Sequence, residues 1–173
     1  PLLARRLRDG ADVSGIPGIG FRRPDGSLCI RAPAVMQRLE AYPRPALGHL
    51  NLAYYLRGGR KSIVVTAGRG CPFPCSYCSV GRQSWLPYRL RPVAEVVAEL
   101  EEAVICQDAA FIDFEDENLS LDRTWFAELL QELSARFGGK GLELRAMNGL
   151  FPPTLDAEIV GAMHRAGFRA LNL

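Results

Sequence analysis

The stretch "GRGCPFPCSYCSVGR", residues 68–82, constrains the chain most strongly because it carries three cysteines in close succession. Cys71 is separated from Cys75 by three residues, and Cys75 is separated from Cys78 by two. The cluster directly follows "SIVVT", residues 62–66, a β-branched apolar run typical of a buried parallel strand. No secretory leader is recognised, and crowded cysteines then indicate metal binding rather than a disulfide framework.

The composition is that of an ordinary globular protein. Apolar residues make up 48% and charged residues 23% of the 173 positions, so the chain can bury a core. No apolar run approaches the roughly 20 residues of a membrane-spanning helix, and the start, "PLLARRLRDG", lacks the apolar segment of a signal peptide. The net charge of +2 gives no reason to expect nucleic acid as a partner. We therefore expect a cytoplasmic protein that binds neither membranes nor nucleic acid.

The segment from residue 61 to residue 173 alternates between strand and helix patterns. After the strand at 62–66, apolar runs predict strands at 109–114, 142–147 and 169–173, and helical spacing predicts helices at 92–104, 122–137 and 154–167. Such alternation with short connections is typical of right-handed βαβ units and a parallel sheet. We predict an α/β fold that comprises the first four strands and three helices of a partial (β/α) barrel.

Residues 1–60 differ, because glycine and proline are frequent and no hydrophobic period persists. A small hairpin is predicted around Asp25-Gly26, and the rest is predicted to be an irregular linker. The chain starts without methionine and ends within the strand pattern "RALNL". We therefore expect a piece of a longer protein. Residues 1–60 would connect to a preceding domain, and residues 61–173 would form the amino-terminal half of a barrel, truncated at its fourth strand.

Three thiolates leave two kinds of metal site open. A structural zinc site needs a fourth ligand, which would have to come from Cys29, Cys106, His49 or His164, all isolated in the sequence. Cys29 and Cys106 are better explained as small buried apolar residues. An iron–sulfur cluster held by three thiolates leaves one iron without a protein ligand, and an open metal position is typical of a catalytic centre.

The CxxxCxxC spacing, with the aromatic residue Tyr77 before its last cysteine, resembles the radical S-adenosylmethionine (radical SAM) superfamily. The resemblance implies that Cys71, Cys75 and Cys78 hold a 4Fe-4S cluster. It implies that Tyr77 lies beside the adenine of S-adenosylmethionine, which binds at the open iron. It also implies reductive cleavage of that molecule to a 5'-deoxyadenosyl radical, with a reductant such as flavodoxin or ferredoxin. Chemistry in such barrels takes place at the carboxyl ends of the strands.

Other segments resemble the cobalamin-linked branch of that superfamily. The lead-in "TAGRGCP" is similar to that of the branch, and "FEDENL" is similar to its second-strand motif. This similarity implies that Asp116, Glu117 and Asn118 face S-adenosylmethionine, with one carboxylate holding its ammonium group. The segment "LRAMNG" matches a third-strand motif with one inserted residue, which makes Arg145 and Asn148 further candidates for cofactor contact.

The branch implies cobalamin as a further cofactor, bound by a domain that precedes the connector, and it implies a small-molecule substrate. The reaction expected is methyl transfer or rearrangement, and no catalytic residue is assigned beyond the cofactor ligands. A methylthiotransferase acting on RNA is a second enzyme hypothesis. A zinc-binding module without enzymatic activity is the alternative from another class.

Overall fold

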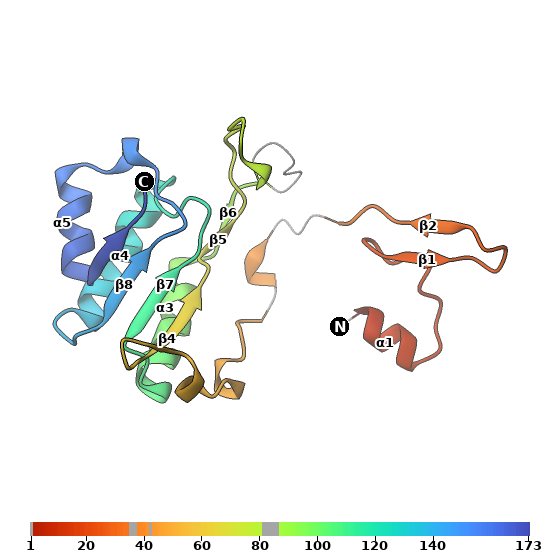
Figure 1. The fold of residues 1–173 in the computed structure, drawn as a ribbon, viewed down its shortest axis with the longest axis horizontal. Helices are drawn as coiled ribbons and strands as arrows, with labels where there is room; N and C mark the ends of the chain where they lie inside the picture. Colours follow the sequence, from red (N-terminus) through yellow and green to blue (C-terminus); the bar gives the residue numbers. More distant parts are fainter. Residues whose placement is uncertain (1, 35–37, 42, 81–86) are drawn as a thin grey trace. The chain divides into compact units, whose positions relative to one another are not determined.

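The computed structural model describes residues 2–34, 38–41, 43–80 and 87–173. The chain divides into two compact units, one of residues 1–36 and one of residues 37–173. Figure 1 shows the ribbon of each unit. Among the described residues, no helix is long and apolar enough to cross a membrane.

The first unit consists of a short helix and a hairpin. The helix α1 (Leu2–Arg8) was not predicted, because its seven residues are too few to show a period. The strands β1 (Gly20–Arg22) and β2 (Leu28–Ile30) pair antiparallel. In their turn the carboxylate of Asp25 accepts a hydrogen bond of 2.8 Å from the Ser27 amide, and Gly26 adopts a φ of +82° that favours glycine. The predicted hairpin is confirmed.

The second unit begins earlier than the barrel boundary expected at residue 61. The 3-10 turns Leu47–His49 and Leu52–Tyr54 each place a leucine, Leu47 and Leu52, in the apolar core of this unit. Single anchoring leucines in a segment rich in proline and glycine show no period, so the sequence alone did not reveal this packing. That residues 1–60 connect to another domain stays a prediction.

The second unit is built on one sheet with the strand order β3-β4-β7-β8-β9 (Figure 1). The strands β4 (Arg60–Val65), β7 (Phe111–Phe114), β8 (Glu143–Ala146) and β9 (Phe168–Leu171) run parallel in chain order, which confirms the predicted partial barrel. The sheet also has an edge strand that was not predicted, β3 (Leu56–Arg57), which pairs antiparallel with β4. A two-residue strand carries too little pattern to be recognised.

The helices follow the strands as predicted. They are α3 (Val93–Glu101), which continues in a π-helical turn (Glu102–Cys106), α4 (Arg123–Phe137) and α5 (Ala157–Ala166). Asp122 caps α4 by accepting a hydrogen bond from the Trp125 amide, and Asp156 caps α5 by accepting one from the Ile159 amide. These caps fix where each helix begins, and so fix the length of the loops at the carboxyl edge of the sheet.

The two faces of the sheet carry different side chains because successive residues of a strand point to opposite sides. Ile63, Ile112 and Leu144 lie in one apolar core with residues of α3, α4 and α5. The other face is polar and aromatic. There the guanidinium groups of Arg57 and Arg145 lie 4.8 Å and 4.7 Å from the centre of the Phe111 ring, each a cation–π contact that covers an otherwise apolar ring.

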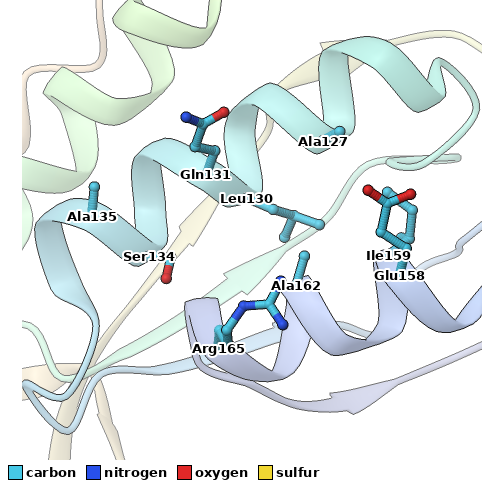
Figure 2. Close-up of a pocket in the computed structure, with 9 residues that line it drawn as sticks. All are labelled: Ala127, Leu130, Gln131, Ser134, Ala135, Glu158, Ile159, Ala162 and Arg165. Carbon is cyan, nitrogen blue, oxygen red and sulfur yellow. The ribbon is translucent and has the colours of Figure 1, made fainter.

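A groove of about 460 Å³ lies between α4 and α5. Figure 2 shows that Ala127 and Ser134 of α4 and Ala162 and Arg165 of α5 line it. None of the residues predicted to contact a cofactor lines this groove, so it is not the site that the sequence indicates. The residues that the sequence indicates lie near the carboxyl ends of β4, β7 and β8.

Candidate functional site

The cysteine loop, residues 70–88, leaves the sheet after β4 and is closed at its base by a short antiparallel ladder. In this ladder β5 (Gly68–Arg69) pairs with β6 (Arg89–Leu90), so that the two ends of the loop lie side by side. Part of the loop, residues 81–86, lies outside the described residues. The pairing places the cysteines at the carboxyl edge of the sheet, as predicted.

The three cysteines of this loop are free thiols. Cys71 and Cys78 are half-buried and Cys75 is exposed, and the Cys78 amide donates a hydrogen bond of 3.1 Å to the Cys75 carbonyl. In the described part of the chain, no three cysteine, histidine or acidic side chains are grouped closely enough to hold a metal ion. The structure thus brings the cysteines into one turn of the loop but does not make their sulfurs converge.

An aromatic contact ties the cysteine loop to the loop that follows β8. The ring of Phe73 stacks on the ring of Phe151, with centroids 4.9 Å apart and an interplanar angle of 29°. The Phe151 amide in turn donates a hydrogen bond of 2.8 Å to the hydroxyl of Ser120, in the loop that follows β7. Ser120 is fully buried. The loops after β4, β7 and β8 therefore form one connected layer over the sheet edge.

Asp116, which the resemblance places facing a cofactor, is buried, with an exposed fraction of 3%. Its Oδ2 accepts a hydrogen bond of 3.0 Å from the Ala67 amide, and its Oδ1 accepts one of 2.5 Å from the Gly68 amide. Burial raises the pKa of Asp116 to about 6, although these two hydrogen bonds act in the opposite direction. The carboxylate is therefore directed at the end of β4.

The two residues after Asp116, Glu117 and Asn118, carry side-chain acceptors without a hydrogen-bond partner among the described residues. Glu117 is half-buried, and its carboxylate has no hydrogen bond or ion pair with the described residues. Asn118 is buried, and its Oδ1 has no hydrogen-bond partner in the part of the chain that the structure describes. A buried acceptor without a partner is unfavourable, so the Asn118 side chain offers an open acceptor at this edge of the sheet.

The two third-strand candidates are separated by the structure. Asn148 is exposed and donates a hydrogen bond of 3.3 Å to the Glu115 carbonyl, so it lies beside the loop after β7. Arg145 lies on the polar face of the sheet, where its guanidinium packs on Phe111 and contacts Glu143 at 3.3 Å. Whether Arg145 also contacts a cofactor stays a prediction. Tyr77 is 90% exposed.

No family model matches the chain, but individual proteins do. The chain is 30% identical over 128 residues to an anaerobic magnesium-protoporphyrin IX monomethyl ester cyclase of Rubrivivax gelatinosus, covering 73% of this chain and 23% of the relative. It is 30% identical over 132 residues to the cobalamin-dependent radical SAM methyltransferase TokK of Streptomyces tokunonensis, covering 73% and 16%. The chain thus spans about a quarter or less of the length of these relatives.

Two solved structures share the fold of this chain. The radical SAM methyltransferase TsrM from Kitasatospora setae, with cobalamin and a 4Fe-4S cluster bound, matches 99% of this chain and 35% of its own with a TM-score of 0.71 and 22% identity. The cobalamin-dependent radical enzyme OxsB matches 99% of this chain and 26% of its own with a TM-score of 0.69 and 15% identity. The resemblance to the cobalamin-linked branch of the radical SAM superfamily is confirmed.

The radical SAM fold also places residues at this edge that sequence reasoning missed. Among the described residues, the buried hydroxyl of Tyr88 has no aligned hydrogen-bond partner, and burial is the main cause that raises its pKa to about 12. The charges of Asp116 and Cys71 add to this rise, so Tyr88 lies near the base of the cysteine loop. Arg91 donates to the Ala67 carbonyl from its amide at 2.8 Å and to the Thr66 carbonyl from its guanidinium at 3.0 Å. Only the position of Arg91 just after the loop could have indicated this role.

The two cysteines outside the loop differ in their surroundings. Cys29 is buried in the hairpin of the first unit, as predicted, whereas Cys106 is exposed and the prediction of its burial is wrong. Cys106 ends the π-helical turn that precedes β7, and the cysteine loop follows β4. Because β4 and β7 are parallel, Cys106 lies at the opposite edge of the sheet from that loop.

Proposed function

We propose that the protein containing this chain is a radical SAM enzyme of the cobalamin-linked branch, and that this chain supplies its cluster-binding half. Cys71, Cys75 and Cys78 would hold a 4Fe-4S cluster, and S-adenosylmethionine would bind at the iron that they leave open. When bound, the reduced cluster supplies the single electron for reductive cleavage of S-adenosylmethionine. The observation that carries the proposal is the CxxxCxxC loop at the carboxyl end of β4 in a half-barrel.

The donor set fits an iron–sulfur cluster with an open position. The loop offers three soft thiol ligands, the type that such clusters prefer. Cys106 does not supply a fourth ligand. Within the described residues of this loop, no other side chain is grouped with the cysteines as a ligand. Because the sulfurs do not converge in the structure, binding would draw them together between two fixed points, the β5–β6 ladder and the Phe73–Phe151 stack. Coupling of metal binding to local ordering is usual.

The residues after β7 fit the recognition of the methionine part of S-adenosylmethionine. Glu117 and Asn118 carry oxygen acceptors without partners among the described residues, and an ammonium group supplies the donors that they lack. Asn148, which bonds to the same loop, is a further candidate. Tyr77, one residue before Cys78 and exposed, is available to pack against the adenine.

The test is anaerobic reconstitution of the full-length protein with iron and sulfide. We expect a brown protein with about four irons per chain, the stoichiometry of such a cluster, and loss of its absorbance when Cys71, Cys75 or Cys78 is replaced by alanine. Cys106→Ala is the matched control, because it removes an exposed thiol at the opposite sheet edge. A colourless protein that binds zinc stoichiometrically would contradict the proposal.

The branch also indicates cobalamin and a small-molecule substrate. TokK is named a cobalamin-dependent methyltransferase, and one TsrM structure holds tryptophan as substrate. We infer methyl transfer or rearrangement of a small molecule, with electrons from a carrier such as flavodoxin or ferredoxin, in the cytoplasm. Cobalamin would be carried by a part of the protein outside this chain. Analysis of the full-length protein for bound cobalamin, and for S-adenosylhomocysteine or 5'-deoxyadenosine after turnover, tests this inference.

A further inference from the structure

We propose that Asp116 is a positioning residue for the cysteine loop and not a ligand of S-adenosylmethionine. By accepting the Ala67 and Gly68 amides, its carboxylate fixes the direction in which the backbone leaves β4 toward Cys71. This inference rests on the proposed function, since it concerns how that cluster site is held.

The first support is that Asp116 uses both carboxylate oxygens on consecutive backbone amides. The distances are 3.0 Å from Ala67 and 2.5 Å from Gly68, and the exposed fraction of Asp116 is 3%. These bonds use two of the roughly four acceptor sites of the carboxylate, and its burial leaves little room for an ammonium group to reach the others. Glu117, one residue later and unpaired within the described residues, is better placed to receive one.

The second support is that Arg91 holds the adjoining backbone through the carbonyl groups of Thr66 and Ala67. Its amide donates to the Ala67 carbonyl at 2.8 Å, and its guanidinium donates to the Thr66 carbonyl at 3.0 Å. Arg91 Nη2 in turn lies 2.6 Å from the buried Glu99 Oε2, in an ion pair without hydrogen-bond alignment. The backbone amides and carbonyls between β4 and β5 are thus paired with Asp116 and Arg91, whose own side chains are held in place.

The third support is the close approach at Gly68. A Cβ atom at this position would lie 2.8 Å from the Arg89 carbonyl oxygen, 2.9 Å from a methyl carbon of Leu90 and 3.4 Å from Asp116 Oδ1. Only glycine therefore allows the backbone to sit between β6 and the carboxylate. The Cys71 thiol is three residues further along, so a shift of the Gly68 backbone is passed to the first sulfur of the loop.

The experiment compares Asp116→Asn with Asp113→Asn in the reconstituted full-length protein. An amide has one acceptor oxygen, and its NH₂ group would face a backbone N–H, so Asp116→Asn breaks half of the clamp. Asp113 is a buried aspartate of the same segment that contacts Arg57 at 3.6 Å and not the cysteine loop. It serves as the matched control for loss of a buried charge.

We expect Asp116→Asn to assemble the cluster, because its three cysteines are intact, and to lose it to a chelator about 10- to 100-fold faster than the wild type. This range follows from the usual effect of removing a group that orients a metal ligand. The electron paramagnetic resonance spectrum of its reduced cluster should change as well, while Asp113→Asn matches the wild type in both measurements. Affinity for S-adenosylmethionine per cluster should remain within a few-fold, because Glu117 and Asn118 are unchanged.

Three outcomes separate the inference from the proposed function. If the wild type takes up no cluster, the proposed function fails. If Asp116→Asn keeps its cluster as the wild type does, or loses affinity for S-adenosylmethionine at an unchanged chelation rate, the positioning role is wrong and the enzyme proposal stands. If Asp116→Asn does not fold, Gly68→Ala replaces it, because that change displaces the amide and keeps the carboxylate. Unchanged cluster loss in a folded Gly68→Ala protein overturns the inference.

Discussion

Phe73 and Phe151 stack with their ring centroids 4.9 Å apart, although 78 positions separate them in the chain. The contact joins the cysteine loop to the loop after β8, and so couples the segment that carries the three cysteines to the third strand of the parallel sheet. Stacked aromatic pairs are worth about 0.5–1.5 kcal/mol beyond the area that they bury. Both rings are half-buried, which places this pair toward the lower end of that range.

The first prediction concerns this pair. Phe73→Leu and Phe151→Leu should each lower the free energy of unfolding, and a double-mutant cycle should give a coupling energy of about 0.5–1 kcal/mol. The measurement is urea unfolding of the two single variants and the double variant. A coupling energy of zero would show that the rings do not interact in solution.

The second prediction concerns the pH dependence of stability. Burial raises the folded-state pKa of Asp116 from 3.8 to about 6, so between these pH values the folded state binds more protons than the unfolded state. The contribution of Asp116 is therefore most favourable below about pH 4 and is lost as the pH rises to about 6. The shift corresponds to at most about 3 kcal/mol.

A comparison of variants isolates the part of the pH dependence of the unfolding free energy that Asp116 causes. Asp116→Asn should remove the part of the decline in unfolding free energy between pH 4 and pH 6 that this group causes. Asp113→Asn should leave that part unchanged. Denaturant unfolding at half-unit pH steps measures it, and an Asp116→Asn curve parallel to the wild type would contradict the raised pKa.

The third prediction concerns two glycines of the α5–β9 segment, with opposite signs. Gly167 ends α5 with a φ of +110°, and a Cβ there would lie 2.8 Å from the Leu142 carbonyl oxygen. Gly167→Ala should therefore destabilise the protein by more than about 1 kcal/mol. Gly161 lies inside α5, and a Cβ there meets only the end of the flexible Arg165 side chain at 3.3 Å.

Gly161→Ala should accordingly stabilise the protein by up to about 1 kcal/mol, because alanine is the better helix former. Thermal unfolding monitored by circular dichroism compares the two variants under one set of conditions. Equal effects of the two changes would mean that the backbone conformation at Gly167 is not the one described.

The fourth prediction concerns the start of α4. Asp122 accepts a hydrogen bond of 3.0 Å from the Trp125 amide, and its replacement by alanine should cost about 0.5–2 kcal/mol of stability. Glu128→Ala is the control, since Glu128 is exposed on the same helix and makes no contact with the described residues. Calorimetric unfolding should show a lower melting temperature for Asp122→Ala alone.

The sequence predicted the parallel strands and their helices well because these elements are long enough to show a period. The strand at β4, the Asp122 cap and the glycine at the end of α5 each have a local signal that the structure reproduces. The strand β3 and the helix α1 escaped notice because two and seven residues carry no period. The anchoring of Leu47 and Leu52 depends on tertiary contacts that no local pattern records.

The candidate site was predictable in its residue types and not in its orientations. The cysteine spacing located the loop, but not whether three sulfurs point to one centre. An acidic residue at a strand end can point outward to a ligand or back to the neighbouring strand, and sequence does not distinguish the two. Asp116 points back, because its two oxygens accept the Ala67 and Gly68 amides at the end of β4.

The β5–β6 ladder joins the two ends of the cysteine loop to each other. Because these two ends pair with each other and not only with the sheet, a conformational change within the loop is confined to the residues beyond the ladder. The sheet can therefore keep its conformation while the loop rearranges on binding a ligand. One segment thus combines a fixed base with a binding region whose conformation can change.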